Sequence, residues 1–358
     1  MKPLLRHFRG SILFAIVCFI LAGIYGWSQE PSLAGVVRVV WIVLVLAVLE
    51  VSLSFDNAVV NATVLEDMDE VWRRRFLTWG MVFAVYGMYI FFPLAIVAVA
   101  AGMGPIEAVK LSLSHPDQYE QIVSSAHTGI AGFGGAFLAM VGLKFFFDAD
   151  KDVHWIGVVE RFLSRFGALP AIEIALLLLV LWGISLTLPL AEAHTFLVSG
   201  ALGIVTFIAV DALGTALELR EERMRLAGAI VRSGLGGFIY LNVLDASFSF
   251  DAVIGAFALS NNMVVIALGL SIGAMFVRSM TLMLVRQGTL SEYRFLEHGA
   301  FWAIVALGAI MLASVRWEIP ESVTGLIGAV LIGLSLWWSV RHNRQSEESE
   351  IQAALNPE

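Results

Sequence analysis

Charged residues are scarce in this sequence and make up 15% of its 358 positions, against about 25% in an ordinary soluble domain. Hydrophobic residues make up 59% instead, and the mean hydropathy is +0.84. Apolar runs recur from Ser11 to Val340, and a helix of roughly 20 such residues crosses a hydrocarbon core of about 30 Å. The composition excludes a soluble globular protein and predicts an all-α polytopic membrane protein in a lipid bilayer.

Cysteine and net positive charge are also lacking. The single cysteine, Cys18, lies in the first apolar run, so internal disulfides and thiolate zinc sites are excluded. The chain carries 22 basic and 30 acidic residues, a net charge of -8, which provides no basic field for nucleic acid. Nucleic acid is therefore not an expected partner, and no motif indicates an organic cofactor or a protein partner.

Ten apolar runs indicate about ten transmembrane helices. They lie at about 11–28, 36–62, 77–101, 127–147, 170–189, 194–216, 233–258, 262–285, 299–315 and 322–340. If the N-terminus is cytoplasmic, 18 of the 22 basic residues fall in cytoplasmic segments, a bias that the positive-inside rule associates with this orientation. We therefore expect both termini in the cytoplasm. No small-x-small cleavage site follows the first run, so we expect it to be retained as a span.

The chain divides into segments rather than soluble domains, because its connections are short. The N-terminal span and its loop occupy 1–35, a first repeat of spans 2–4 occupies 36–147, the cytoplasmic segment and linking spans 5–6 occupy 148–232, a second repeat (spans 7–9) with the last span occupies 233–340, and a cytoplasmic tail occupies 341–358. The tail is rich in acidic residues, and we expect it to be solvated and mobile.

Two spans carry the same acidic motif. The second contains Glu50-Val-Ser52-Leu-Ser54-Phe55-Asp56-Asn57, and the seventh contains Asp245-Ala-Ser247-Phe-Ser249-Phe250-Asp251-Ala252. The copies are 195 residues and five spans apart, so they run in opposite directions across the membrane. This arrangement is typical of an inverted-topology repeat, here formed by spans 2–4 and 7–9.

The four acids of these motifs are the main candidate site. A carboxylate inside the membrane costs about 2.5–3.5 kcal/mol to insert, so it usually marks a pathway for ions or protons. Glu50 and Asp245 lie near the middle of their spans, and Asp56 and Asp251 follow six residues later, a distance of about 9 Å along a helix. If the two spans cross near the midplane, the four acids form a ladder along which a cation could pass.

The geometry of span 2 has two solutions. In a straight helix Glu50 and Asp56 point about 120° apart, and Ser54, Asn57 and Asn61 share the face of Glu50. Either both faces look into the helix bundle, or the helix is interrupted around 52–57 and frees backbone carbonyls as ligands. Carboxylate, hydroxyl and amide oxygens suit Mg²⁺, Ca²⁺ or Mn²⁺ rather than copper or zinc. Acids that repel each other also bind protons, so we expect exchange of a divalent cation against protons.

Several stretches resemble the TerC/Alx family of integral membrane proteins, in its branch of unassigned bacterial proteins. They are residues 50–58, 245–251, 273–278 and 296–299, within spans 2–4 and 7–9. The resemblance implies a bacterial inner membrane location, a link to tellurium resistance and to manganese export, and a metal site. By motif, the implied metal ligands are Glu50, Asp56, Asn57, Asp245 and Asp251. Ala252 stands where the first copy has Asn57, so the two half-sites are unequal.

Six further residues are secondary candidates. Ser54 and Ser249 belong to the motifs, Asp211 lies near the cytoplasmic end of span 6, His127 and His298 open equivalent spans, and Arg278 lies within span 8. An imidazole or carboxylate at these positions could accept a proton. Helix-end packing, and pairing of Arg278 with an intramembrane acid, are the structural alternatives. A minor alternative is a cytoplasmic metal contact at His154 and Glu160.

These observations favour a secondary transporter and not an enzyme. We expect it to export a divalent cation, with Mn²⁺ favoured and Ca²⁺ or Mg²⁺ as alternatives. The main alternative is a non-transporting scaffold or metal-loading protein linked to metal or tellurium resistance, although only short loops and the tail offer a docking surface. An intramembrane aspartyl protease would resemble others of its class in a Gly-x-Gly-Asp motif, which is absent. In a purely structural alternative, the acids are protonated and hydrogen-bond between helices.

Overall fold

The computed structural model describes residues 2–355 apart from 67, 81, 83–86, 88, 150, 152, 170, 227–233, 258, 261, 289–291, 318 and 320. These ranges contain helices, turns and bends but no strand. Six of the described helices are long and apolar enough to cross a membrane, namely His7–Gln29, Leu33–Leu53, His127–Phe146, Leu190–Met224, Met263–Gln287 and Leu296–Ser314. Ile172–Ser185 is a shorter apolar helix, and Leu235–Ala246 is the apolar first part of a longer helix. The chain is therefore an all-α polytopic membrane protein, as the composition predicts.

The helices follow one another with short connections. The first half of the chain contains α1 (Lys2–Gln29), α2 (Leu33–Leu53), α3 (Phe55–Glu66), α4 (Glu70–Arg75), the π-helix η1 (Phe76–Gly80), α5 (Phe92–Ala100), α6 (Pro105–Ser114), α7 (Pro116–Ser125) and α8 (His127–Phe146). The second half contains α9 (Gly157–Phe166), α10 (Ile172–Ser185), α11 (Leu190–Leu226), α12 (Leu235–Phe257), α13 (Met263–Gln287), α15 (Leu296–Ser314) and α16 (Glu321–Leu355). In the described ranges, each of the ten apolar runs overlaps one or two of these helices.

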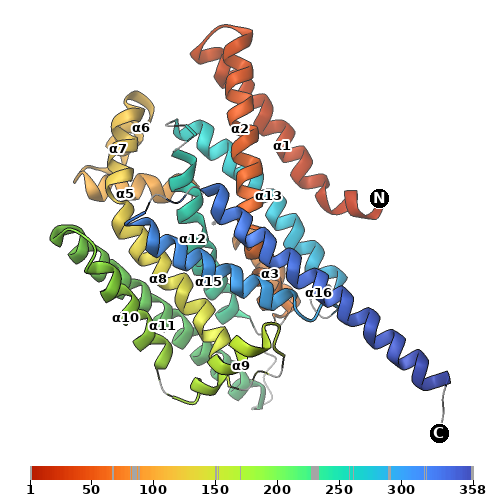
Figure 1. Ribbon diagram of the computed structural model, residues 1–358. Coiled ribbons are helices and arrows are strands. Elements are labelled where there is room, and N and C mark those ends of the chain that lie inside the picture. Colours follow the sequence, from red (N-terminus) through yellow and green to blue (C-terminus); the bar gives the residue numbers. More distant parts are fainter. Residues whose placement is uncertain are drawn as a thin grey trace.

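The helices α8 and α15 pack against each other in the middle of the bundle (Figure 1). α11 packs along α8, while α3 and α16 pack along α15. α2 packs against α13, and α1 contacts both of them. The two termini lie toward one side of the bundle, and the α1–α2 turn lies with α6 and α7 on the opposite side (Figure 1).

Glycines allow α8 and α15 to approach closely. A Cβ atom on Gly308 of α15 would lie 2.9 Å from the Ala139 backbone nitrogen and 3.1 Å from the Gly135 carbonyl oxygen of α8. A larger residue would therefore force the two backbones apart. Close backbone contact through small residues is the usual mode of helix association in membranes, because lipid provides no hydrophobic drive between helices.

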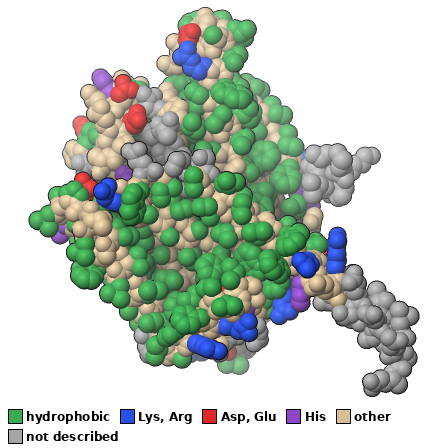
Figure 2. Space-filling view, in the orientation of Figure 1, with side chains coloured by type: hydrophobic (Ala, Val, Ile, Leu, Met, Phe, Trp, Pro, Cys, Tyr) green, Lys and Arg blue, Asp and Glu red, His purple; other side chains and the backbone are tan. Residues whose placement is uncertain are grey.

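Apolar side chains cover the outside of the bundle as well as its core. On the face shown in Figure 2, hydrophobic side chains form a continuous area, and the charged side chains lie around its margins, with Lys and Arg mostly at the lower and right edges and Asp and Glu mostly near α6 and α7. Trp41 of α2, Leu179 of α10 and Leu190 of α11 are among the exposed apolar residues. Such a surface is unfavourable in water and is expected where lipid is the solvent.

The segment after residue 341 is helical as far as residue 355. α16 continues from the last apolar run through Arg341 and ends at Leu355. Glutamate, glutamine, alanine and leucine make up much of this extension and are strong helix formers. Local helix propensity therefore accounts for the helical form of this polar segment, whose expected mobility stays a prediction.

Candidate functional site

The first acidic motif lies where α2 ends and α3 begins. Ser54 separates the two helices with φ -101° and ψ 18°, values outside the α-helical range. The bend is local, because the Ser54 N–H still donates to the Glu50 carbonyl at 2.9 Å and the Ala58 N–H to the Ser54 carbonyl at 3.2 Å. α12 runs without interruption through the second motif. The helix that carries the first motif is therefore interrupted at Ser54, whereas the helix that carries the second motif is continuous.

Glu50 lies in the last turn of α2 and is 2% exposed. Its Oε1 accepts hydrogen bonds from the Ser54 hydroxyl at 2.6 Å and from the Tyr89 hydroxyl at 2.8 Å. The space for its side chain comes from α13, because a Cβ at Gly273 would lie 2.4 Å from both Cβ and Cγ of Glu50. Two hydroxyl groups thus donate to this buried carboxyl group, and Gly273 of α13 leaves the space that it occupies.

Asp245 lies near the middle of α12 and is 4% exposed. Its Oδ1 accepts a hydrogen bond from Asn61 Nδ2 at 2.8 Å, and Asn57 also interacts with this carboxyl group. Asn57 and Asn61 are one turn apart, so α3 presents two amides to α12. These contacts join the two motif-bearing segments of the chain.

One buried polar group connects the two motifs. We call it the acidic core, and it comprises Glu50, Ser54, Asn57, Asn61, Tyr89, Asp245 and Ser249. Tyr89 links its halves, because its hydroxyl bonds to Glu50 and also interacts with Ser249 and Asp245. The Ser249 hydroxyl donates to the Asp245 backbone carbonyl at 2.8 Å. Glu50 and Asp245 are close enough to repel each other when both are ionised.

Two amide oxygens of the acidic core lack a partner. Oδ1 of Asn57 and Oδ1 of Asn61 are buried and accept no hydrogen bond from any residue that the structure describes. A buried acceptor without a partner costs about 1–3 kcal/mol and calls for an explanation. No group of three or more His, Cys, Asp and Glu side chains in the described ranges is close enough to hold a metal ion. A cation here would be held by two carboxylates together with amide and hydroxyl oxygens.

Asp56 lies beside the acidic core rather than within it. Its Oδ1 accepts the backbone N–H of Asn57 at 2.9 Å, in the first turn of α3. With Phe248 and Ala252 of α12, Asp56 lines a cavity of about 20 Å³, close to the smallest space that holds one water molecule. The side chain of Asp251 lies outside the described residues. Of the predicted ladder, the described structure joins Glu50 and Asp245 in one hydrogen-bonded group, while Asp56 shares no hydrogen bond with them but lies close enough to Glu50 to interact with it electrostatically.

A larger cavity of about 700 Å³ lies between α3, α8, α10, α11 and α12. Asp211 belongs to this cavity, where it forms an ion pair with Lys144, and not to the acidic core. Val64 of α3 and Tyr240 of α12 also line it. They lie about one turn from Asn61 and from Asp245 along their helices. The cavity therefore lies near Asn61 and Asp245 along these helices, although neither residue lines it.

His127 and Arg278 also lie apart from the acidic core. His127 Nε2 is 3.4 Å from the Ser314 hydroxyl, where α8 begins and α15 ends. Arg278 Nε donates to the Leu77 carbonyl of η1 at 2.6 Å. No ion pair of Arg278 with an acid occurs in the described part of the chain. Its predicted acidic partner is therefore replaced by a backbone carbonyl of the π-helix.

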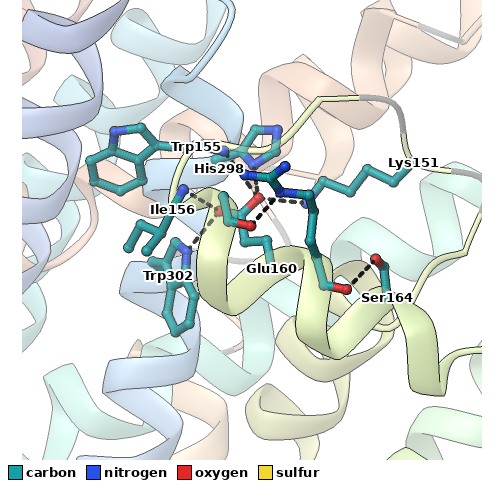
Figure 3. Close-up of polar contacts among 9 residues, drawn as sticks. Lys151, Trp155, Ile156, Glu160, Ser164, His298 and Trp302 are labelled. Carbon is teal, nitrogen blue, oxygen red and sulfur yellow. Dashed lines mark hydrogen bonds and ion pairs between the residues drawn. The ribbon is translucent and has the colours of Figure 1, made fainter.

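His298 contacts Glu160 of α9 instead of the acidic core (Figure 3). Its Nδ1 lies 2.8 Å from Glu160 Oε2, and Trp302 Nε1 donates to Oε1 at 3.0 Å. The backbone N–H groups of Trp155 and Ile156 donate to the same carboxylate. Burial by itself raises the pKa of Glu160, but these hydrogen bonds outweigh it and hold the pKa at about 2. Glu160 is therefore an ionised acceptor that fixes α9 to α15.

Two members of the acidic core were not predicted as site residues. Asn61 follows Asn57 by four residues on the face of Glu50, and this spacing is a signal that identifies it. Tyr89 carries no comparable signal, because a single tyrosine in an apolar run is common. Its role depends on contacts with α2 and α12 that only the folded chain reveals.

A sequence family matches most of the chain. Its description is a protein of unknown function, DUF475, and the match extends over residues 55–346. It includes Asp56, Asn57, Asn61 and the whole second motif, and it begins just after Glu50. No curated protein and no solved structure matches the sequence significantly. Since the match covers well over half of its residues, the chain belongs to the DUF475 family of proteins of unknown function.

Proposed function

We propose that this protein is a secondary transporter that moves a divalent cation, with Mn²⁺ as the favoured substrate, through the acidic core in exchange for protons. One observation carries the proposal. Glu50 and Asp245 come from separate helices and are buried in one group that also contains two unpartnered amide oxygens. Ionisable groups inside a membrane are costly and usually belong to ion or proton pathways.

The donor atoms of the acidic core fit a hard divalent cation. Carboxylate, amide and hydroxyl oxygens are preferred by Mg²⁺, Ca²⁺ and Mn²⁺. A cation between Glu50 and Asp245 would neutralise their repulsion, and the oxygens of Asn57 and Asn61 would complete its coordination. When the cation leaves, protons would replace its charge on the two carboxylates. Cation and proton movement would then be coupled through the same groups.

The 700 Å³ cavity supports a route to this site from one side of the bundle. If a cation reached the acidic core from this cavity along α3 and α12, it would have to replace the hydrogen bond between Asn61 and Asp245. The bias of basic residues favours a cytoplasmic location for this side, which is the side from which an exported cation would enter. The resemblance of the acidic motifs to the TerC/Alx family favours Mn²⁺ among the three cations.

Flux measurements in proteoliposomes test this function. Mn²⁺, Ca²⁺ and Mg²⁺ uptake would be followed at several imposed pH gradients for the native chain and for Glu50→Gln and Asp245→Asn. Asp117→Asn, on the exposed face of α7, is a matched control for loss of one negative charge. We expect flux that depends on the pH gradient, falls at least tenfold in both core variants and persists in the control. Absence of flux for all three cations in the native chain would overturn the proposal.

A further inference from the structure

The short helix α9 buries its acid and exposes its apolar residues. Glu160 is 1% exposed, whereas Val158 is 82% and Phe162 is 58% exposed. Val158, Phe162 and Phe166 follow one another at intervals of four residues, so they form one stripe along the helix. Leu169 continues this exposed apolar surface beyond the helix end. We call Val158, Phe162, Phe166 and Leu169 the apolar stripe.

Contacts of Glu160 fix the rotation of α9 about its own axis. The carboxylate receives His298 and Trp302 from α15, and Lys151 Nζ lies 3.6 Å from it (Figure 3). Glu160 lies almost opposite the stripe on a helical projection. With the acid held inward, the stripe is turned away from the bundle. Its exposure therefore follows from well-formed buried contacts and not from loose attachment of the helix.

Positive charge accompanies the apolar stripe. Arg161 and Arg165 are exposed and lie four residues apart along one flank of it. Glu160 is the only acid of α9, so the helix presents apolar and cationic groups but no exposed negative charge. α9 also connects α8 with α10, two apolar helices, through short segments. These connections hold it close to the membrane boundary, where Trp155 just before it is typical of interfacial residues.

We propose that α9 is an interfacial helix whose apolar stripe lies among lipid acyl chains and whose Arg161 and Arg165 bind the headgroup of an anionic phospholipid. An apolar face with cationic residues at its flank is the usual pattern of helices that lie in the membrane surface. A protein partner could cover the stripe, but the charge on its flank is complementary to anionic headgroups. The assignment is independent of any transport function.

A fluorescent probe on the stripe tests its environment. In a Cys18→Ser background, which removes the only cysteine, Val158→Cys carries a polarity-sensitive dye. Leu179→Cys of α10 is the lipid-facing control, and Gln118→Cys of α7 is the water-facing one. In vesicles, we expect the Val158 dye to emit like the Leu179 dye, to be quenched by lipids spin-labelled near the headgroup and to be protected from aqueous iodide. Quenching by iodide as strong as for Gln118 would overturn the assignment.

The headgroup preference is tested with paired arginine variants. Vesicles of phosphatidylcholine are compared with mixtures that contain phosphatidylglycerol, spin-labelled in turn, so that quenching reports which lipid lies next to the dye. One basic residue near an anionic surface favours the anionic lipid about fivefold. We expect Arg161→Gln with Arg165→Gln to reduce the preference by more than fivefold, and Arg220→Gln with Arg223→Gln, at the exposed end of α11, to leave it unchanged. Equal preferences in the two double variants would overturn anionic-lipid binding by α9.

Discussion

Substitution of Gly273 by alanine tests how α13 provides space for Glu50. The added Cβ would lie 2.4 Å from Cβ and Cγ of Glu50 and 3.0 Å from the Ala47 carbonyl oxygen. Carbon atoms in favourable contact are about 3.5–4.0 Å apart, so the new atom has to move by about 1.1–1.6 Å. A rotamer change relieves the contact with Cγ but not with Cβ. We therefore expect α13 to shift relative to α2.

Three contributions determine how this shift changes the free energy of unfolding. Overpacking of a close contact costs about 1–3 kcal/mol. Displacement of Glu50 also removes a hydrogen bond from Ser54 or Tyr89, and such a bond contributes about 0.5–1.5 kcal/mol. The better helix propensity of alanine offsets about 1 kcal/mol. We expect a net loss of about 0.5–3.5 kcal/mol in the free energy of unfolding.

Thermal unfolding in detergent, together with Mn²⁺ flux in vesicles, measures this effect. Gly183→Ala in α10 is the matched control, because a Cβ there would meet no atom within 4 Å. We expect the control to unfold at or slightly above the temperature of the native chain, and Gly273→Ala to unfold well below it with reduced flux. Equal unfolding temperatures for the two variants would refute the reasoning from the α2–α13 contact.

Three further substitutions test other contacts. Asn61→Asp puts a second carboxylate beside Asp245, so the unfolding temperature should be lower without metal and rise more on addition of Mn²⁺ than in the native chain; an equal rise would contradict a metal role for this position. Glu160→Gln removes a carboxylate whose pKa is about 2 instead of 4.5. A depressed pKa stabilises the fold above pH 4.5 and loses this contribution as the pH falls toward 2, so a pH series of unfolding temperatures should be flatter in this variant, and an identical slope would exclude the contribution. Arg278→Gln removes the charged donor to the Leu77 carbonyl, which should cost about 1.5–3 kcal/mol in thermal unfolding; native stability would show that η1 does not depend on this bond.

The helical architecture and the centre of the site follow from sequence because they depend on local signals. Apolar runs of span length predict helices wherever they occur. Two costly acids in repeated motifs predict that Glu50 and Asp245 face the protein interior. The helical period puts Asn57 and Asn61 on the face of Glu50. The structure brings all four residues together across α2, α3 and α12.

Contacts between distant segments account for what the sequence did not predict. Tyr89 and Glu50 meet only because α2 and the segment around Tyr89 pack together, and no spacing rule links their positions. His298 was a candidate for proton transfer with helix-end packing as the alternative, and a carboxylate 138 residues earlier in the chain contacts it. The direction of Asp56 depends on the bend at Ser54, where a serine hydroxyl bonds to a side chain one turn earlier. Several backbone paths can satisfy such a hydroxyl, so local propensity does not select among them.

The unequal conformations of the two motifs have a consequence for how the molecule could move. The first copy bends at Ser54, while the second passes straight through Ser249. If the two halves are inverted copies, an exchange of these conformations generates a second state in which α2 and α3 form one straight helix and α12 bends. Accessibility would then pass from the side of the 700 Å³ cavity to the opposite side. In this exchange the bend would move from Ser54 to Ser249, and each half of the molecule would adopt the conformation that the other half had before.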